Sequence, residues 1–148
     1  MKTNTDLLRE LMTRQSDLSQ SVIDAMSKID RKHFVPPKLS FSAYDDSPLS
    51  IGLNQTISAP HMHAMMATDL EEKLFPGSNV LDIGAGSGYL TALMAEMVGP
   101  TGHVTAIERI PELTAMAQHN LSHYPHLSKK NHVSYWRWQA GVQGERSL

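Results

Sequence analysis

The sequence contains no cysteine, and that absence removes several kinds of chemistry at once. It excludes a disulfide framework, a thiolate nucleophile and a zinc ion held by cysteine. A reducing compartment is harmless to such a chain, and we expect a cytoplasmic protein.

Long apolar runs and an excess of one charge are missing as well. The N-terminal stretch MKTNTDLLRELMTRQ mixes charged with apolar residues, whereas a signal peptide or a membrane helix needs an unbroken apolar run. The 13 basic and 15 acidic side chains give a formal net charge of -2, which leaves no basic face for a phosphate backbone. We therefore expect no membrane and no nucleic acid as partners, and we take the chain to be a monomer.

The chain does have the length and apolar content of one globular domain, with 148 residues of which 41% are hydrophobic. Helical spacing of apolar residues predicts two short helices near the N-terminus. The spacing is seen at Leu7, Leu8, Leu11 and Met12, and again at Val22, Ile23, Met26 and Ile29. We expect the first helix to be capped by Thr5 or Asp6 and the second by Ser19 or Ser21.

The next segment, from His33 to Thr56, is interrupted by prolines and by Gly52 and predicts a long loop without regular structure. A third helix is expected after it, because apolar residues return at helical spacing. Ser58 stands at the N-cap position of this helix, and Pro60 follows in its first turn.

Beyond this helix the pattern alternates between short strands and helices. The expected order is strand 80–83, turn 84–88, helix 90–98, strand 103–108, helix 111–121 and a strand that begins at 133. Strands that alternate with helices of this length predict a parallel, doubly wound α/β sheet preceded by the N-terminal helices. Only the first half of such a sheet is expected, because the sequence stops at the third strand.

The stretch LDIGAGSGYL places Gly84, Gly86 and Gly88 between a strand and a helix. Glycines at such a turn allow positive φ angles and let backbone N–H groups approach a ligand. Glu108 ends the next strand, where a carboxylate can accept hydrogen bonds from both hydroxyls of a ribose. The order of strand, turn, helix, strand and acid favours a nucleoside-bearing cofactor over glycines that serve only a tight turn.

The spacing of these glycines separates two classes of cofactor. Nicotinamide enzymes normally use G-x-G-x-x-G to seat a pyrophosphate, whereas this chain has G-x-G-x-G preceded by Asp82. A carboxylate at that place repels a pyrophosphate but suits the cationic sulfur and the amino group of S-adenosylmethionine. We therefore favour a methyltransferase over a dehydrogenase.

Three further blocks of sequence are informative together: DRKHFVPP, AYDDSPLSIGLNQTISAPHMHAMM and LDIGAGSGYLTALMAEMVGPTGHVTAIER. They resemble the protein-L-isoaspartate (D-aspartate) O-methyltransferases, and methyltransferases in general do not share the TISAPHMHA segment. The resemblance implies a class I, Rossmann-like methyltransferase fold with S-adenosylmethionine as cofactor. It also implies a repair reaction that methylates isoaspartyl carboxylates in damaged proteins and peptides. On this basis residues 1–135 form the methyltransferase domain, divided into helices and loop (1–76) and a cofactor-binding part (77–135).

The same resemblance, taken with the glycine motif, assigns the site residues. Ser58 matches the residue to which the family gives the catalytic role. The expected cofactor-binding residues are Gln55, Thr56, Ile57, Ser58, His63, Asp82, Gly84, Gly86, Ser87, Gly88 and Glu108.

The chemistry of methyl transfer explains why so few catalytic groups are expected. An isoaspartyl carboxylate is ionised at neutral pH and is already a nucleophile, so the reaction needs no general base. Catalysis is then mostly alignment of the reacting atoms and removal of water. We expect the Ser58 hydroxyl to orient the substrate carboxylate, and the alternative that it only caps the following helix stays open.

Two other polar pairs receive structural interpretations. His61 and His63 form an H-x-H pair, but the sequence offers no evident third ligand, and we expect no metal. Asp45 and Asp46 could serve acid–base chemistry, but a solvated loop turn is the favoured interpretation.

The C-terminal residues 136–148 break the resemblance, because the family continues into a GDGR-G turn and four more strands. A shifted reading frame through permitted codons for residues 136–141 encodes V-G-D-G-R-Q-G, so we interpret 136–148 as an aberrant, frameshifted or alternatively spliced tail. Loss of the second half should expose the apolar row Val80, Leu81 and Ile83 and leave this chain with little activity. The alternative to an enzyme is a non-catalytic fragment or a partner-binding module.

Overall fold

The computed structural model describes residues 1–128, 133–137 and 146–147, and its larger sheet has four strands in the order β3-β4-β5-β6. β3 (Asn79–Ile83), β4 (His103–Glu108) and β5 (Val133–Arg137) are parallel, and β6 (Arg146–Ser147) is antiparallel to β5. The predicted strands are therefore present, and the prediction that they form a parallel sheet is confirmed.

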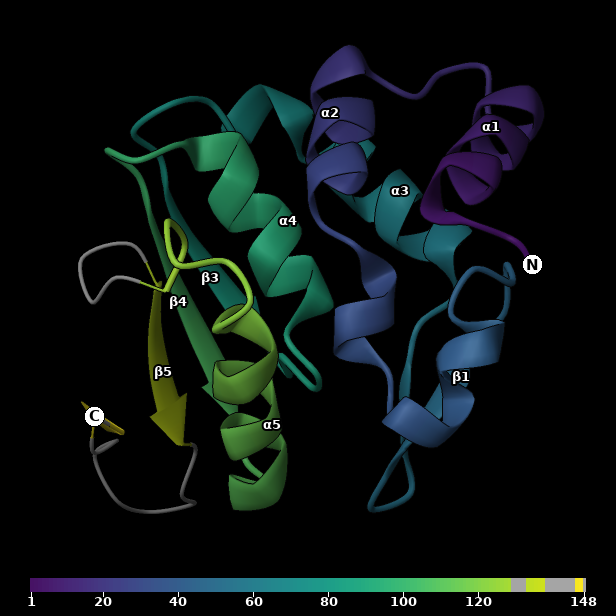
Figure 1. Ribbon diagram of the computed structural model, residues 1–148. Coiled ribbons are helices and arrows are strands. Elements are labelled where there is room, and N and C mark those ends of the chain that lie inside the picture. Colours follow the sequence, from purple (N-terminus) through teal and green to yellow (C-terminus); the bar gives the residue numbers. More distant parts are fainter. Residues whose placement is uncertain (129–132, 138–145, 148) are drawn as a thin grey trace.

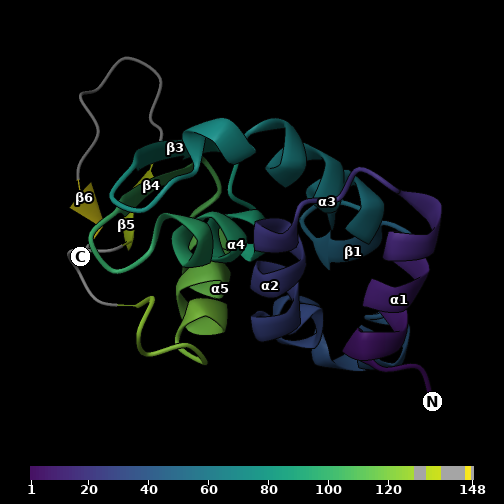
Figure 2. The same ribbon diagram turned by 90° about the horizontal axis from the view of Figure 1, so that it is seen from above.

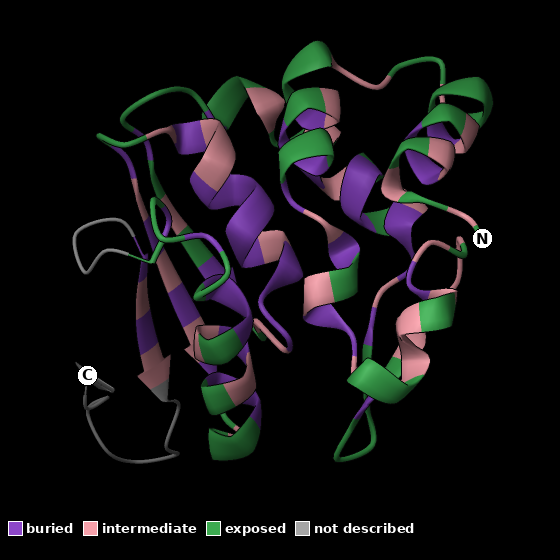
Figure 3. Ribbon diagram, in the orientation of Figure 1, coloured by how far each residue is buried: buried purple, intermediate pink, exposed green. Residues whose placement is uncertain are grey.

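Two helices connect these strands and lie against the same face of the sheet (Figure 1; Figure 2). They are α4 (Tyr89–Val98) and α5 (Pro111–Leu121), and both agree with the predicted helices within one residue. α4 is buried along most of its length (Figure 3), because the N-terminal helix α2 (Gln20–Lys28) also packs against it. α4 is thus the element that joins the N-terminal part to the sheet.

The opposite face of β3 is open. Successive side chains of a strand point to opposite faces, so Val80 is half-buried beside the helices, while Leu81 and Ile83 are 55% and 75% exposed. The expected exposure of the apolar row is therefore confirmed for Leu81 and Ile83 and wrong for Val80.

The first helices begin with side-chain caps. α1 (Asn4–Arg14) is capped by Thr3, whose hydroxyl accepts from the Asp6 N–H while the Asp6 carboxylate accepts from the Thr3 N–H. The predicted cap at Thr5 or Asp6 is wrong, because this reciprocal pair starts the helix earlier. Ser19 caps α2, as predicted, with its hydroxyl accepting from the Val22 N–H.

The predicted long loop is wrong in part, because its residues form short regular elements. These are the 3₁₀ helices η1 (Arg31–Phe34) and η2 (Pro37–Ser42) and the strands β1 (Leu49–Gly52) and β2 (Gln55–Ile57). β1 and β2 form an antiparallel hairpin, and its turn residues Leu53 and Asn54 have φ angles of 55° and 56°. A two-residue turn with both φ angles positive matches the right-handed twist of the strands. β2 ends at Ile57, shortly before the third helix begins.

The third helix, α3 (Pro60–Asp69), has Ala59 as its N-cap and no side-chain cap of its own. The expected N-cap position of Ser58 is therefore wrong by one residue. Asp46 supplies an acceptor from a distant loop, since its carboxylate accepts from the His61 N–H at 2.9 Å. A short 3₁₀ helix, η3 (Glu71–Lys73), follows before β3.

One hydrophobic core runs from α1 to β5. At its centre Phe34 packs edge-on against Tyr89 at 5.3 Å and stacks with Tyr124 at 6.0 Å between ring centroids. The Tyr124 hydroxyl accepts from the Asp30 N–H at 2.7 Å. This contact fastens η1 to the chain beyond α5.

The predicted tail is only partly described. Trp136 and Arg137 continue β5, and the backbone of Arg146–Ser147 pairs with Tyr135 and Trp136. The remaining residues of that tail, 138–145 and 148, lie outside the described residues, so the frameshift interpretation stays a prediction. Within the described part of the chain, no helix has the length and apolar character that crossing a membrane requires.

Candidate active site

A pocket of about 220 Å³ lies where the segment after the hairpin meets the glycine turn. It brings together residues from β2, α3, β3, the glycine turn and α4. The expected site residues in its wall are Thr56, Ile57, Ser58, His63, Asp82, Gly84, Gly86 and Ser87. The structure therefore gathers most of the predicted site in one place, although segments of the chain far apart in sequence contribute to it.

Gln55, Gly88 and Glu108 do not line this pocket. Gln55 is exposed at the start of β2. A Cβ at Gly88 would lie 3.1 Å from the Cβ and 3.3 Å from the Cα of Ala117, and the φ angle of Gly88 is +88°. Gly88 thus permits close packing of α4 against α5 instead of making room in the pocket.

The glycine turn does not offer its first N–H groups to a ligand. The N–H groups of Gly84 and Ala85 donate to the Ile107 carbonyl at 2.7 and 3.1 Å, and that of Gly88 donates to the Ala85 carbonyl at 2.9 Å. The expectation that backbone N–H groups approach a ligand is wrong for these residues. A turn without those donors is a poor seat for a pyrophosphate, which agrees with the choice against a dinucleotide.

What Gly84 does provide is open space. Its φ angle is +84°, and apart from its chain neighbours no described residue has an atom within 4 Å of the place where a Cβ would stand. Because Gly84 lines the pocket, a side chain there would occupy space that is now accessible to a ligand. This is the fit that a bulky adenosyl cofactor needs.

Glu108 stabilises the glycine turn through hydrogen bonds. Its carboxylate accepts from the Gly86 N–H at 2.9 Å and from the Ile110 N–H at 3.0 Å, and the side chain is buried. Each carboxylate oxygen can accept a further hydrogen bond. The expected contact with a ribose therefore stays a prediction, while the structural role of Glu108 is evident.

Asp82 is a buried acid in the pocket wall. Burial raises the pKa of its carboxyl, the Thr91 hydroxyl that donates to it at 2.6 Å acts in the opposite direction, and the charge of Glu108 raises the pKa further. A carboxylate this poorly solvated is well placed to attract a cation. It suits a ligand that carries a positive charge.

The Ser58 hydroxyl is available for a ligand. Ser58 is half-buried, and its hydroxyl makes no hydrogen bond with any residue of the described part of the chain. Its carbonyl accepts from Nη1 of Arg31 at 2.8 Å. Since α3 is capped elsewhere, the interpretation of Ser58 as a helix cap is excluded.

His63 is a neutral imidazole. Burial, and to a smaller extent the charge of Arg31, lowers the pKa of His63 to about 3. Its ring lies edge-on to Tyr89 with 4.9 Å between centroids, and its Nδ1 is buried without a hydrogen-bond partner among the described residues. At neutral pH His63 can therefore shape the pocket without adding charge.

Several other residues that line the pocket were not predicted from the sequence. These are Met66, Ile83, Ala85, Tyr89 and Leu90. Two of them carried a usable signal: Tyr89 directly follows the glycine motif, and Met66 lies about one helical turn beyond His63.

The other polar pairs have structural roles. Asp46 accepts from His61 Nδ1 at 3.0 Å and, weakly, from Arg14 at 3.5 Å, so the solvated-turn interpretation is wrong for Asp46 and holds for exposed Asp45. Across the part of the chain that the structure describes, no group of three or more metal-binding side chains comes together.

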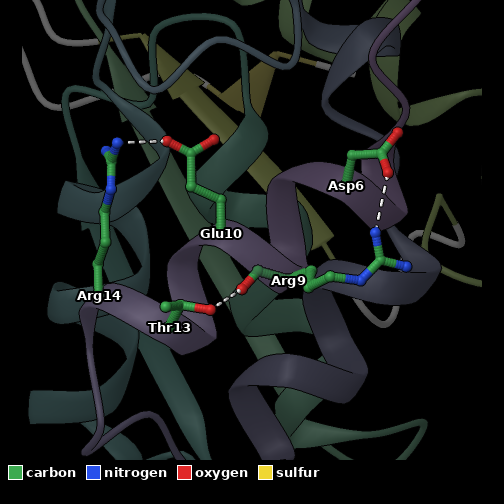
Figure 4. A pocket seen from close by; sticks show the side chains of 5 residues that line it. All are labelled: Asp6, Arg9, Glu10, Thr13 and Arg14. Carbon is green, nitrogen blue, oxygen red and sulfur yellow. Dashed lines mark hydrogen bonds and ion pairs between the residues drawn. The ribbon is translucent and has the colours of Figure 1, made fainter.

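A second hollow lies along α1 and has a different character (Figure 4). Its wall is formed by Asp6, Arg9, Glu10, Thr13 and Arg14. The charged side chains pair with one another, Arg9 with Asp6 at 3.1 Å and Arg14 with Glu10 at 2.7 Å. These are ordinary ion pairs of an exposed helix face, and they satisfy each other without a ligand.

Comparison with known proteins gives consistent matches. A sequence model of the protein-L-isoaspartate(D-aspartate) O-methyltransferase (PCMT) family matches residues 2–136. A relative from Methanothrix thermoacetophila, named protein-L-isoaspartate O-methyltransferase, is 55% identical over 104 residues, which cover 70% of this chain and 49% of the relative. Protein-L-isoaspartate O-methyltransferase 1 of Arabidopsis thaliana is 48% identical over 118 residues, 80% of this chain and 50% of the relative. The chain thus spans about half the length of the curated relatives it matches.

A solved structure agrees with these sequence matches. The crystal structure of a Plasmodium falciparum protein, described as a putative protein-L-isoaspartate O-methyltransferase in complex with S-adenosyl-L-homocysteine, superposes with a TM-score of 0.81 and 30% identity. The match covers 91% of this chain and 62% of that one. The expected class I, Rossmann-like fold is confirmed.

Proposed function

Because the chain belongs to the protein-L-isoaspartate(D-aspartate) O-methyltransferase family, we propose that its pocket binds S-adenosylmethionine and helps to methylate isoaspartyl carboxylates in damaged proteins and peptides. One observation carries the proposal furthest. The Thr56–Ser58 segment and the turn from Asp82 to Ser87 border the same pocket, so a cofactor and a carboxylate could meet there.

The cofactor fits the residues that are present. S-adenosylmethionine supplies a methyl group on a positively charged sulfur when it is bound. The buried Asp82 carboxylate provides an opposite charge, Gly84 leaves open space, and Glu108 keeps the glycine turn in position. Our proposal gives cofactor contacts to Thr56, Ile57, Ser58, His63, Asp82, Gly84, Gly86 and Ser87, and to Gln55, Gly88 and Glu108 at the margin.

Ser58 is the proposed catalytic residue. Its hydroxyl is free to donate a hydrogen bond to one oxygen of a substrate carboxylate and so to orient the other oxygen. An ionised carboxylate needs no base, and His63, with a pKa of about 3, would not donate a proton at neutral pH. The buried side chains of Ile57 and Tyr89, together with half-buried Ser58, would exclude water and strengthen these polar contacts.

The domain limits, the cellular compartment and the monomeric state belong to the same proposal. We propose that residues 1–135 form the methyltransferase part, that 136–148 depart from the family pattern, and that the protein acts as a monomer in the cytoplasm. Sedimentation of the 148-residue chain tests the monomeric state directly.

The proposal can be tested with alanine at one glycine that lines the pocket and at one glycine that does not. Gly84 and Gly99 both have positive φ angles, and at neither does a described residue beyond the chain neighbours come within 4 Å of the position that a Cβ would take, but Gly99 does not line the pocket as Gly84 does. A positive φ angle disfavours alanine at both positions. We expect S-adenosylhomocysteine, measured by calorimetry, to bind Gly84→Ala at least about tenfold more weakly than wild type, and Gly99→Ala to bind within a few-fold of wild type. Equal affinity of all three proteins would contradict the cofactor site.

Substrate class needs a separate assay. Methyl transfer to an isoaspartyl peptide should exceed transfer to the same peptide with ordinary aspartate. Transfer to both peptides at equal rates would contradict the isoaspartyl assignment.

A second candidate function is a non-catalytic module that binds a partner through the uncovered face of β3. The exposure of Leu81 and Ile83 favours it, because large apolar side chains on a strand face are usually covered. S-adenosylhomocysteine binding without any methyl transfer by the 148-residue chain would favour this candidate over the enzyme.

A further inference from the structure

Arg31 is buried completely, although it is charged. It begins η1, and its guanidinium reaches two other segments. Nη1 donates to the Ser58 carbonyl at 2.8 Å, and Nη2 donates to the Ser47 carbonyl at 3.1 Å. One side chain therefore ties the segment that carries the proposed catalytic serine to the chain just before β1.

The charge of Arg31 is not paired. No carboxylate of the described residues lies within ion-pair distance of its guanidinium, and its Nε is buried without a hydrogen-bond partner in the same part of the chain. Its Cζ lies 5.9 Å from the centroid of the Tyr89 ring. Burial lowers the pKa of Arg31 to about 10, so it still carries its charge at neutral pH. Keeping an unpaired charge inside a protein is costly, and a ligand of opposite charge would reduce that cost.

The layer between Arg31 and the pocket is neutral. Ser58, His63 and Tyr89 all line the pocket, and each lies against or near Arg31. Burial lowers the pKa of His63 and raises that of Tyr89, so neither is charged at neutral pH. The charge of Asp46 raises the pKa of Arg31, but the Asp46 carboxylate is paired with His61 and does not line the pocket. Little therefore screens the field of Arg31 on the Ser58 side of the pocket.

We propose that Arg31 is a positioning residue for the substrate carboxylate: it fixes the main chain at Ser58, and its buried charge attracts the carboxylate to the Ser58 hydroxyl. This inference rests on the proposed function and deepens it. The attraction acts on a carboxylate that is bound but has not yet reacted. Arg31 therefore contributes to substrate affinity more than to the rate of the chemical step.

The test compares a charged ligand with a neutral ligand of the same shape. The probes are an isoaspartyl peptide and the same peptide with a primary amide in place of the carboxylate. Their affinities are measured by NMR titration on the 148-residue chain with S-adenosylhomocysteine present. The proteins are wild type, Arg31→Met, which is neutral, and Arg31→Lys, which keeps the charge. Arg9→Met is the matched control, because Arg9 is an exposed arginine of α1 outside the pocket.

We expect wild type to bind the carboxylate peptide more tightly than the amide peptide, and Arg31→Lys and Arg9→Met to keep that preference. In Arg31→Met the ratio of carboxylate to amide affinity should fall by about tenfold. If Arg31 had only a structural role, Arg31→Met would weaken the binding of both peptides alike and leave the ratio of their affinities unchanged. An unchanged ratio in Arg31→Met, or no carboxylate preference in wild type, would overturn the inference.

The same experiment tests the proposed function separately. If wild type does not bind S-adenosylhomocysteine, the proposed function fails. If wild type binds S-adenosylhomocysteine, but the ratio of carboxylate to amide affinity is the same in Arg31→Met as in wild type, only the inference fails. If Arg31→Met does not fold, Arg31→Gln takes its place as the neutral variant, and loss of the carboxylate preference in Arg31→Lys would also overturn the inference.

Discussion

Acidification should destabilise this protein through His63. The ring is buried near the charged Arg31, and no carboxylate of residues 1–128 or 133–137 forms an ion pair with it. The pKa of His63 falls from the ordinary value of 6.5 to about 3 in the folded protein. Between these two values the unfolded chain binds a proton that the folded chain does not, so stability falls as the pH falls.

The size of the loss in stability follows from the difference between the pKa of His63 in the unfolded chain and its pKa in the folded protein. At pH 7.5 the contribution of His63 to the pH dependence is close to zero, because the residue is neutral in both states. At pH 5.5 the unfolded state is stabilised by protonation, and the free energy of unfolding should be lower by about 1.4 kcal/mol. The loss should continue at about 1.4 kcal/mol for each further pH unit until the folded protein also takes up the proton.

Urea denaturation at a series of pH values measures this loss. His63→Gln should remove about 1.4 kcal/mol of the difference between pH 7.5 and 5.5, leaving the smaller part due to groups such as His33, whose pKa is lowered by burial and by His123. His119→Gln, the same change at an exposed histidine of α5, serves as the control for the substitution itself. Identical profiles for His63→Gln and wild type would refute the reasoning.

Three further predictions concern single contacts. Ser58→Ala should change the free energy of unfolding by less than about 0.5 kcal/mol in urea denaturation, because Ser58 does not cap α3, whereas loss of a true cap costs about 1 kcal/mol; the larger loss would restore the capping role. Gly88→Ala should lower the melting temperature, because its added Cβ meets Ala117 and its φ angle is +88°, and an unchanged melting temperature would contradict the packing role. Tyr124→Phe should cost about 1–2 kcal/mol, since it leaves the Asp30 N–H without its acceptor, and a neutral outcome would show that water replaces the hydroxyl.

The sequence predicted the sheet and its helices well because their signals are local. Pro111 begins α5 and Ser19 caps α2, and each of these residues acts on its immediate neighbours. The glycine turn was found for the same reason. Its glycines have φ angles of +84°, +57° and +88°, which few other residues adopt.

The hairpin was missed because its signal is weak. β1 and β2 are short, and Leu53 is an unusual residue for a turn position with a positive φ angle. The start of α3 was misplaced because its acceptor comes from Asp46, a contact between residues far apart in sequence. Local patterns cannot reveal such a contact.

The sequence identified residues of the site but could not predict how they contact one another. Asp82 and Ser58 were identified from the glycine motif and from the family resemblance, whereas the engagement of the turn N–H groups by Ile107 depends on how β3 and β4 pair. The burial of Arg31 is a tertiary property in the same sense. An arginine in a DRKH segment would ordinarily be expected on the surface.

The most direct test of the central claim is an amide NMR titration of the 148-residue chain with S-adenosylhomocysteine. We expect saturable shifts at Gly84, Gly86 and Ser87, smaller shifts at Ile57 and Ser58, and no change along α1. Shifts confined to the hollow of α1, or no saturable shift at the glycine turn, would contradict it.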